Sequence, residues 1–296
     1  MRGKYPAFII RDTEYFRKSN IRQITVPGIY TALPRPERRK NGVRIFDSEK
    51  ETDMNKIYWA GDSTVAFNSI VTYPQTGIGQ VFPLYLTEDA EVINHAMNGR
   101  STKSFMSEGR LKAIEKEISK EDFLFIQFGH NDEKEADPER FTEPQGEFKN
   151  NLRIYISVAR KAGAWPVLIT PLTRRTYIGE HKLDEGKHAP YVAAMKEIAA
   201  AENVPLVDLY EMSRAGVEKA GDKITYNWYM HVPAGVYPYK PDGLDTDNTH
   251  LQYAGAVIFA GMIAKGLKEL GGRYAGLIRS NWDGVDRLYI SGELTE

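Results

Sequence analysis

From Lys56 onward, short apolar segments of the chain alternate with longer segments of helical periodicity, and this alternation constrains the fold more than any other feature. The short segments are rich in residues that favour β-strands. They cover residues 56–60, 90–96, 122–129, 164–171 and 204–209. The third, DFLFIQFG, is an almost unbroken apolar run, which is typical of a strand buried on both faces of a sheet.

The intervening segments place apolar residues three and four positions apart, as on one face of an α-helix. The segments with this pattern cover residues 104–119, 147–163, 191–203 and 254–272. Strands that alternate with helices of this length indicate right-handed βαβ units, in which a parallel sheet is covered on both faces. We therefore predict an α/β fold, a three-layer sandwich, for residues 56–273.

The two ends of the chain lie outside this pattern. Residues 34–44 are basic, contain prolines and lack periodicity. We expect residues 1–55 to form an N-terminal extension of uncertain structure, with a solvated arm favoured over a polyanion-binding patch. Residues 274–296 follow the last predicted helix and have their own aromatic residues. We expect this C-terminal tail to pack on the domain.

Charge and composition exclude several classes of function. A net charge of −1 gives no reason to expect nucleic acid as a partner, and no apolar stretch approaches the roughly 20 residues that span a membrane. The absence of cysteine excludes disulfides and thiolate catalysis. The N-terminus lacks the features of a signal peptide, so the sequence as written predicts a cytoplasmic protein, or a secreted one if a leader has been trimmed. It leaves the oligomeric state open.

Polar residues gather just after the predicted strands and just before the last predicted helix. The four groups are Gly61-Asp62-Ser63, Asn98-Gly99, Gly129–Asp132 and the pair Asp247 and His250. Each group alone is ordinary turn chemistry, and Ser63 could merely cap a following helix. Ligands of open parallel sheets, however, bind outside the carboxyl ends of the strands. Four such groups at that edge favour a functional site.

These residue types fit acyl transfer without a metal or cofactor. A serine hydroxyl becomes a nucleophile when an imidazole takes its proton and a carboxylate orients that imidazole. Ser63, His250 and Asp247 can supply these groups, with Asp247 and His250 together on one loop at a helix start. Asp245, the competing acid, lacks the three-residue spacing to His250.

The tetrahedral intermediate of this chemistry needs hydrogen-bond donors for its oxyanion. The backbone N–H groups of Ser63 and Gly99 and the side-chain amide of Asn131 are the candidates. Other polar residues could contact a substrate. Arg100, Arg174 and Arg175 could pair with carboxylates, although solvated surface charge explains them equally well. His231 and Tyr237 lie in an aromatic-rich segment that could border the cleft or simply pack on the sheet.

The motifs in this order resemble the four blocks of SGNH (GDSL-type) hydrolases. The longer stretches AGDSTV, NHAMNGRSTKSF, FIQFGHNDEK, KAGAWPVLITPLTRR and KPDG followed by DNTH look like rhamnogalacturonan acetylesterases of bacterial pectin-degrading systems. The resemblance covers about residues 56–273. It implies a flavodoxin-like parallel sheet (the SGNH hydrolase fold), a metal-independent triad of Ser63, His250 and Asp247, and an oxyanion hole of Ser63, Gly99 and Asn131. Ile78 stands where the family usually has a tryptophan.

From the motifs and the resemblance we predict a serine esterase that removes O-acetyl groups from acetylated pectic oligo- or polysaccharides through an acetyl-enzyme. One alternative is the same chemistry on another ester, such as xylan acetate, a lipid or a thioester. A second alternative is a carbohydrate-binding module that keeps the fold without catalysis.

Overall fold

A computed structural model describes residues 54–280, and the predictions for residues 1–53 and 281–296 lie outside the described residues. Its centre is a parallel five-stranded sheet with the strand order β2-β1-β3-β4-β7. The strands are β1 (Asn55–Gly61), β2 (Ala90–Asn94), β3 (Phe123–Gln127), β4 (Trp165–Ile169) and β7 (Leu206–Val207). This is the flavodoxin-like order, and it confirms the predicted fold.

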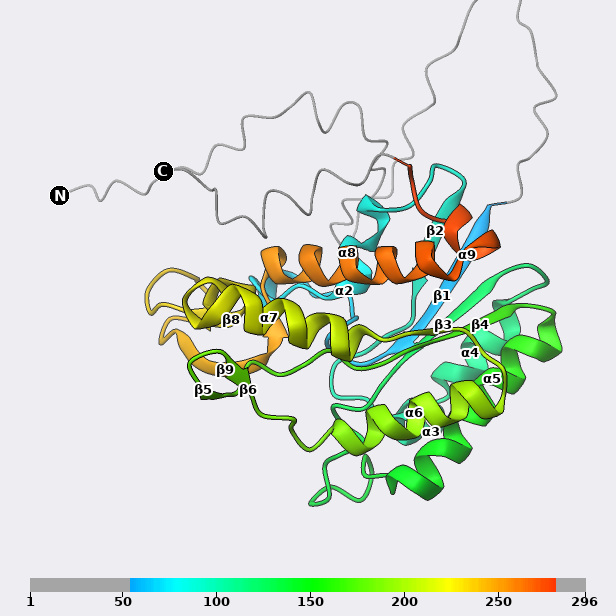
Figure 1. Cartoon of the computed structure of the whole chain (residues 1–296), viewed down its shortest axis with the longest axis horizontal. Coiled ribbons are helices and arrows are strands. Elements are labelled where there is room, and N and C mark those ends of the chain that lie inside the picture. Colours follow the sequence, from blue (N-terminus) through cyan, green and yellow to red (C-terminus); the bar gives the residue numbers. More distant parts are fainter. Residues whose placement is uncertain (1–53, 281–296) are drawn as a thin grey trace, which may run out of the picture. The chain divides into compact units, whose positions relative to one another are not determined.

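Helices cover both faces of the sheet (Figure 1). One face carries α2 (Ile78–Val81), α7 (Leu209–Thr225) and α8 (Tyr253–Leu270), and the other carries α3 (Thr102–Ser107), α4 (Arg110–Glu117), α5 (Lys149–Ala162) and α6 (Ala189–Ala201). The side chains of neighbouring residues on β1 lie on opposite faces of the sheet. Trp59 packs in the first core, under α2, α7 and α8, and Tyr58 packs in the second core, under α3 to α6. The three predicted layers are therefore present, each side of the sheet having its own apolar core.

Two helical predictions differ from the structure. Residues 104–119 form two helices, α3 and α4, because Gly109 adopts a left-handed conformation with φ of 75° between them, one that favours glycine. Helix α7 was not predicted, and it is interrupted at Gly221, whose φ is 79°. Helix α5 ends at Ala162, within one residue of the predicted boundary, and Gly163 is its C-terminal cap. Within residues 54–280, no helix is both long and apolar enough to cross a membrane.

Strand β9 (Leu244–Leu251) pairs antiparallel with β8 (Tyr229–Val232) outside the main sheet. The sequence did not predict this hairpin, and it places Asp247 and His250 on a strand instead of a loop at a helix start. Helix α8 begins directly after β9. An added Cβ at Gly255 would lie 2.1 Å from the carbonyl oxygen of Trp228, so this close approach of the helix to the start of β8 requires glycine.

Short segments connect these elements. They are four short helical turns, η1 (Ile70–Thr72), η2 (Phe82–Leu84), η3 (Pro144–Phe148) and η4 (Tyr226–Trp228), and a second small hairpin of β5 (Tyr177–Gly179) and β6 (Lys182–Leu183). After α8 comes α9 (Gly272–Gly276), followed by Leu277 and Ile278, which are buried in the first core. The described start of the tail thus packs on the domain.

Candidate active site

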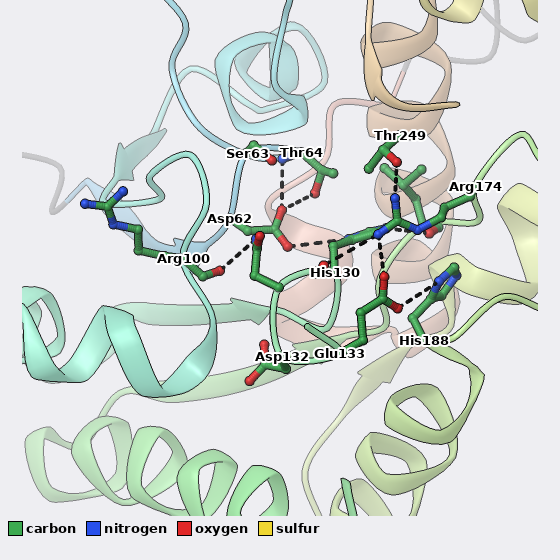
Figure 2. A network of polar contacts seen from close by, with 12 residues as sticks. Asp62, Ser63, Thr64, Arg100, His130, Asp132, Glu133, Arg174, His188 and Thr249 are labelled. Atoms are coloured by element: carbon green, nitrogen blue, oxygen red, sulfur yellow. Dashed lines mark hydrogen bonds and ion pairs between the residues drawn. The ribbon is translucent and has the colours of Figure 1, made fainter. Parts of the chain in front are cut away.

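Ser63 lies in a tight turn that directly follows β1. The Asp62 carboxylate accepts hydrogen bonds from the backbone N–H (2.9 Å) and hydroxyl (2.8 Å) of Thr64, and its carbonyl accepts from the N–H of Ala66 (3.0 Å). Figure 2 shows Asp62 below this turn, facing His130. The first helical turn after β1 is η1, which begins at Ile70, so Ser63 does not cap a helix. The turn instead fixes the serine at the carboxyl edge of the sheet.

His250 joins Ser63 to Asp247 by two hydrogen bonds. Its Nε2 lies 2.9 Å from Ser63 Oγ, and its Nδ1 lies 2.8 Å from Asp247 Oδ2. An ionised carboxylate can only accept, so Nδ1 carries the proton and Nε2 is left to accept from the serine hydroxyl. The structure therefore brings together three residues separated by up to 187 positions in the chain.

Asp247 is held in its ionised form. Burial alone would raise its pKa, but the hydrogen bond and charge of His250 and the backbone N–H groups of His250 and Thr249 lower the pKa to about 2. The same carboxylate oxygen, Oδ1, accepts from both N–H groups at 2.9 and 3.1 Å. A charged partner on Nδ1 is what an imidazole needs to act as a general base.

The three predicted oxyanion donors come from three loops. Within residues 54–280, the backbone N–H groups of Ser63 and Gly99 donate to no protein acceptor. Gly99 has a φ of 80°, which favours glycine. The side chain of Asn131 donates from Nδ2 to the carbonyl of Arg100 at 3.2 Å, so it lies against the loop of Gly99.

Arg140 also lies near the site, a position that its sequence neighbourhood does not predict. Its Nη1 donates to Asn131 Oδ1 at 3.3 Å and would lie 3.9 Å from a Cβ placed on Gly99. The contact assigns the oxygen of the Asn131 amide to Arg140, which leaves the NH₂ group for Arg100 and the site. No sequence motif marks Arg140, because only tertiary structure brings it there.

The three arginines predicted to contact substrate all bind protein groups. Arg100 makes a two-point contact with Glu108, at 2.9 and 2.8 Å. Arg175 is buried and donates to Thr225 Oγ1 (3.1 Å) and to the Asp222 carbonyl (2.7 Å). Arg174 binds the side chains of Glu133 and Thr249. These contacts place all three guanidinium groups within the protein's own network.

The remaining predicted positions also have defined surroundings. His231 is buried, with Nδ1 donating to the Asp245 carbonyl at 2.6 Å and Nε2 lying 2.9 Å from Asn248 Oδ1, so it supports β9 from behind. Tyr237 is half-buried, and its ring packs against that of Tyr73 with 5.6 Å between the centroids. Ile78 is fully buried in the first core, so its side chain is not offered to a substrate.

Asp132, next to Asn131, is buried, and burial raises its pKa to about 7 despite hydrogen bonds from Thr102 and Thr142. Between about pH 4 and 7 the folded chain keeps a proton here that the unfolded chain loses, so stability falls as pH rises through this range. We expect Asp132→Asn to remove this part of the pH dependence, which amounts to about 3 kcal/mol between pH 5 and pH 8. Urea unfolding of both proteins at pH 5 and pH 8 measures it. An equal change with pH in both would contradict the assignment.

The arrangement can carry out acyl transfer. It combines a hydroxyl, an imidazole and an ionised carboxylate in hydrogen-bond series with donors for a negatively charged oxygen. Among the described residues, no three His, Asp, Glu or Cys side chains are grouped so as to hold a metal ion.

Residues 60–256 match the GDSL-like lipase/acylhydrolase family. Two proteins of Bacillus subtilis (strain 168) are similar over most of their length. The probable rhamnogalacturonan acetylesterase YesY is 43% identical over 217 residues, which are 73% of this chain and 94% of that protein. The rhamnogalacturonan acetylesterase RhgT is 38% identical over 220 residues, 73% of this chain and 90% of that protein.

Solved structures have the same fold. The protein YxiM of Bacillus subtilis superposes with a TM-score of 0.63 at 29% identity, over 74% of this chain, and this chain spans 58% of that one. The acetylxylan esterase Axe2 of Geobacillus stearothermophilus gives a TM-score of 0.52 at 17% identity, over 78% of this chain and 100% of that one. At that identity, Axe2 is evidence for the fold alone.

Proposed function

The chain belongs to the GDSL-like lipase/acylhydrolase family, and from this premise we propose that it is a serine esterase that removes O-acetyl groups from pectic saccharides of the rhamnogalacturonan type. The observation that carries the chemistry is the hydrogen-bonded series from Ser63 Oγ through His250 to Asp247. The substrate class rests on the two relatives named rhamnogalacturonan acetylesterases, at 43% and 38% identity.

The reaction proceeds in two halves. His250 Nε2 takes the proton of Ser63 as Oγ attacks the acetyl carbonyl, and Asp247 stabilises the imidazolium that forms. The N–H groups of Ser63 and Gly99 and the amide of Asn131 bind the resulting oxyanion. The tetrahedral intermediate collapses, His250 returns the proton to the departing sugar oxygen, and an acetyl-Ser63 remains. Water, deprotonated by His250, then releases acetate.

The proposal is tested with acetylated rhamnogalacturonan oligosaccharides. We expect the protein to release acetate from them, with a mass loss of one acetyl group per event and the sugar chain intact. The measurement is mass spectrometry before and after treatment. Acetylated xylo-oligosaccharides serve as the competing substrate. A larger kcat/KM on acetylated xylo-oligosaccharides than on the rhamnogalacturonan oligosaccharides would contradict the proposed substrate class and favour xylan acetate.

Acyl-chain length provides a second test of the proposed reaction. A site that accommodates acetate should turn over p-nitrophenyl acetate and lose at least about tenfold on the butyrate and octanoate esters, because longer chains must find additional room. Initial rates at several concentrations of each ester measure this. A preference for octanoate would favour a lipid-type substrate instead.

A further inference from the structure

The four residues His130–Glu133, which we call the 130–133 segment, follow β3, contact the loops of Ser63 and Gly99 directly and reach β9 through Arg174 (Figure 2). The buried side chain of His130 has Nδ1 3.4 Å from Asp62 Oδ2 and Nε2 3.0 Å from the Leu172 carbonyl. Asp62 in turn organises the turn that carries Ser63. The first residue of the segment is thus coupled to the nucleophile's turn.

The next two residues bind the loop of Gly99. Asn131 donates to the Arg100 carbonyl at 3.2 Å, and Asp132 accepts from the backbone N–H of Thr102 at 3.0 Å and from its hydroxyl. Asp132 is buried, so these hydrogen bonds are shielded from water. The segment therefore fixes the second loop as well.

The last residue reaches β9 through one other side chain. Glu133 Oε1 binds Arg174 Nη2, and Arg174 Nη1 donates to the hydroxyl of Thr249, the residue directly before His250. The Glu133 side chain is 8% exposed and that of Arg174 25%. The other carboxylate oxygen of Glu133 lies 3.6 Å from Nδ1 of His188, which is buried. Charge-assisted hydrogen bonds in such a partly buried setting are stronger and more directional than exposed ones.

Strand β9 needs such a connection because it does not belong to the main sheet. Among residues 54–280 it pairs only with β8, and that pairing shifts register on both sides of Met230, the partner of Asp247. Besides the pairing with β8, two backbone hydrogen bonds between described residues hold β9, from Thr76 N to the Leu251 carbonyl (2.8 Å) and from Arg175 N to the Asn248 carbonyl (2.9 Å). The Arg174 side chain donates a hydrogen bond to Thr249, which lies between Asn248 and Leu251 in the strand.

We propose that Glu133 and Arg174 are positioning residues that act through Thr249 to hold His250 at hydrogen-bonding distance from Ser63. The inference rests on the proposed function of the triad. In this inference Arg174 connects Glu133 to Thr249 and does not bind a substrate carboxylate. Misplacing a reacting group by about 1 Å can cost on the order of 10²-fold in rate. The two backbone hydrogen bonds to β9 remain when Arg174 is replaced, so we expect a partial loss of activity.

The test uses Arg174→Met, Thr249→Val and the double variant. We expect each single change to lower kcat on p-nitrophenyl acetate by about 10- to 100-fold, with KM within about twofold, because substrate binding is untouched. The double variant should be no slower than the slower single variant, since both changes break the same connection. The rate at which a fluorophosphonate probe labels Ser63 should fall in parallel, independently of any sugar.

Arg214→Met is the matched control. Arg214 also forms a partly buried pair with a glutamate, Glu218, at 3.4 Å, but both residues lie on α7, and among the described residues Arg214 bonds none of Ser63, Asp247, Thr249 and His250. It should leave kcat unchanged. Raised KM with unchanged kcat in Arg174→Met, or losses that multiply in the double variant, would overturn the inference. If Arg174→Met does not fold, as judged by circular dichroism, the nearly isosteric Thr249→Val decides alone.

The two proposals fail differently. A wild-type protein that neither hydrolyses the ester nor reacts with the probe would overturn the proposed function, and this inference with it. If the wild-type protein is active in both assays and the Arg174 and Thr249 variants have the same kcat as the wild type, only this inference is overturned.

Discussion

Ser63→Ala is expected to reduce acetate release by about 10⁴- to 10⁶-fold, because the acetyl-enzyme cannot form without its oxygen nucleophile. The fold should be unaffected. The hydroxyl's one hydrogen bond among the described residues is to His250 Nε2, at 2.9 Å, and the turn is held by Asp62 instead. The measurement is acetate released from acetylated rhamnogalacturonan oligosaccharides, with circular dichroism to verify folding.

Ser69→Ala is the control for this substitution. Ser69 is an exposed serine on the same connection, and its side chain makes no capping hydrogen bond to η1. It should retain full activity. If wild type and Ser63→Ala release acetate equally, the serine esterase function is contradicted and the carbohydrate-binding alternative remains.

Asp247→Asn is expected to lower kcat by roughly 10⁴-fold while KM changes little. The variant keeps the size of the side chain but loses the charge that the imidazolium requires. An amide NH₂ facing Nδ1 would also favour the tautomer with its proton on Nε2, which cannot accept from Ser63. Steady-state kinetics on p-nitrophenyl acetate measure the effect.

Asp245→Asn distinguishes the two acids of this strand. Asp245 is exposed, and its contact with His231 uses the backbone carbonyl, which the substitution keeps. Activity within about twofold of wild type is expected. A larger loss in Asp245→Asn than in Asp247→Asn would exchange the roles of the two carboxylates.

The main sheet could be predicted because its signal is local. Each of its strands is an apolar segment between turn residues, and the longest run, around Phe125, is buried on both faces as its composition predicts. The β8–β9 hairpin has no such signal. Residues 245–250 read DTDNTH, and the two Asp and one Asn among them are of types depleted in strands. Pairing with β8 and packing against the start of α8 override that preference.

The split between α3 and α4 and the interruption of α7 at Gly221 were missed for a related reason. Gly109 and Gly221 both adopt positive φ within stretches of helical periodicity, and periodicity does not reveal where a helix stops. The position of Ser63 was predictable from its motif at a strand end. The contacts of Arg140 and Arg174 were not, since they join residues 9 and 75 positions from their partners Asn131 and Thr249.

The hairpin that carries Asp247 and His250 separates two tasks along one short stretch of chain. Its base is anchored, because Gln252 donates to the Tyr229 carbonyl at 2.8 Å and Leu251 binds Thr76. Its tip, residues 233–243, touches the connection after Ser63 through Tyr237 and Tyr73. Insertions or deletions at the tip would therefore change the surface beside the connection that follows Ser63, while the anchored base keeps Asp247 and His250 in place.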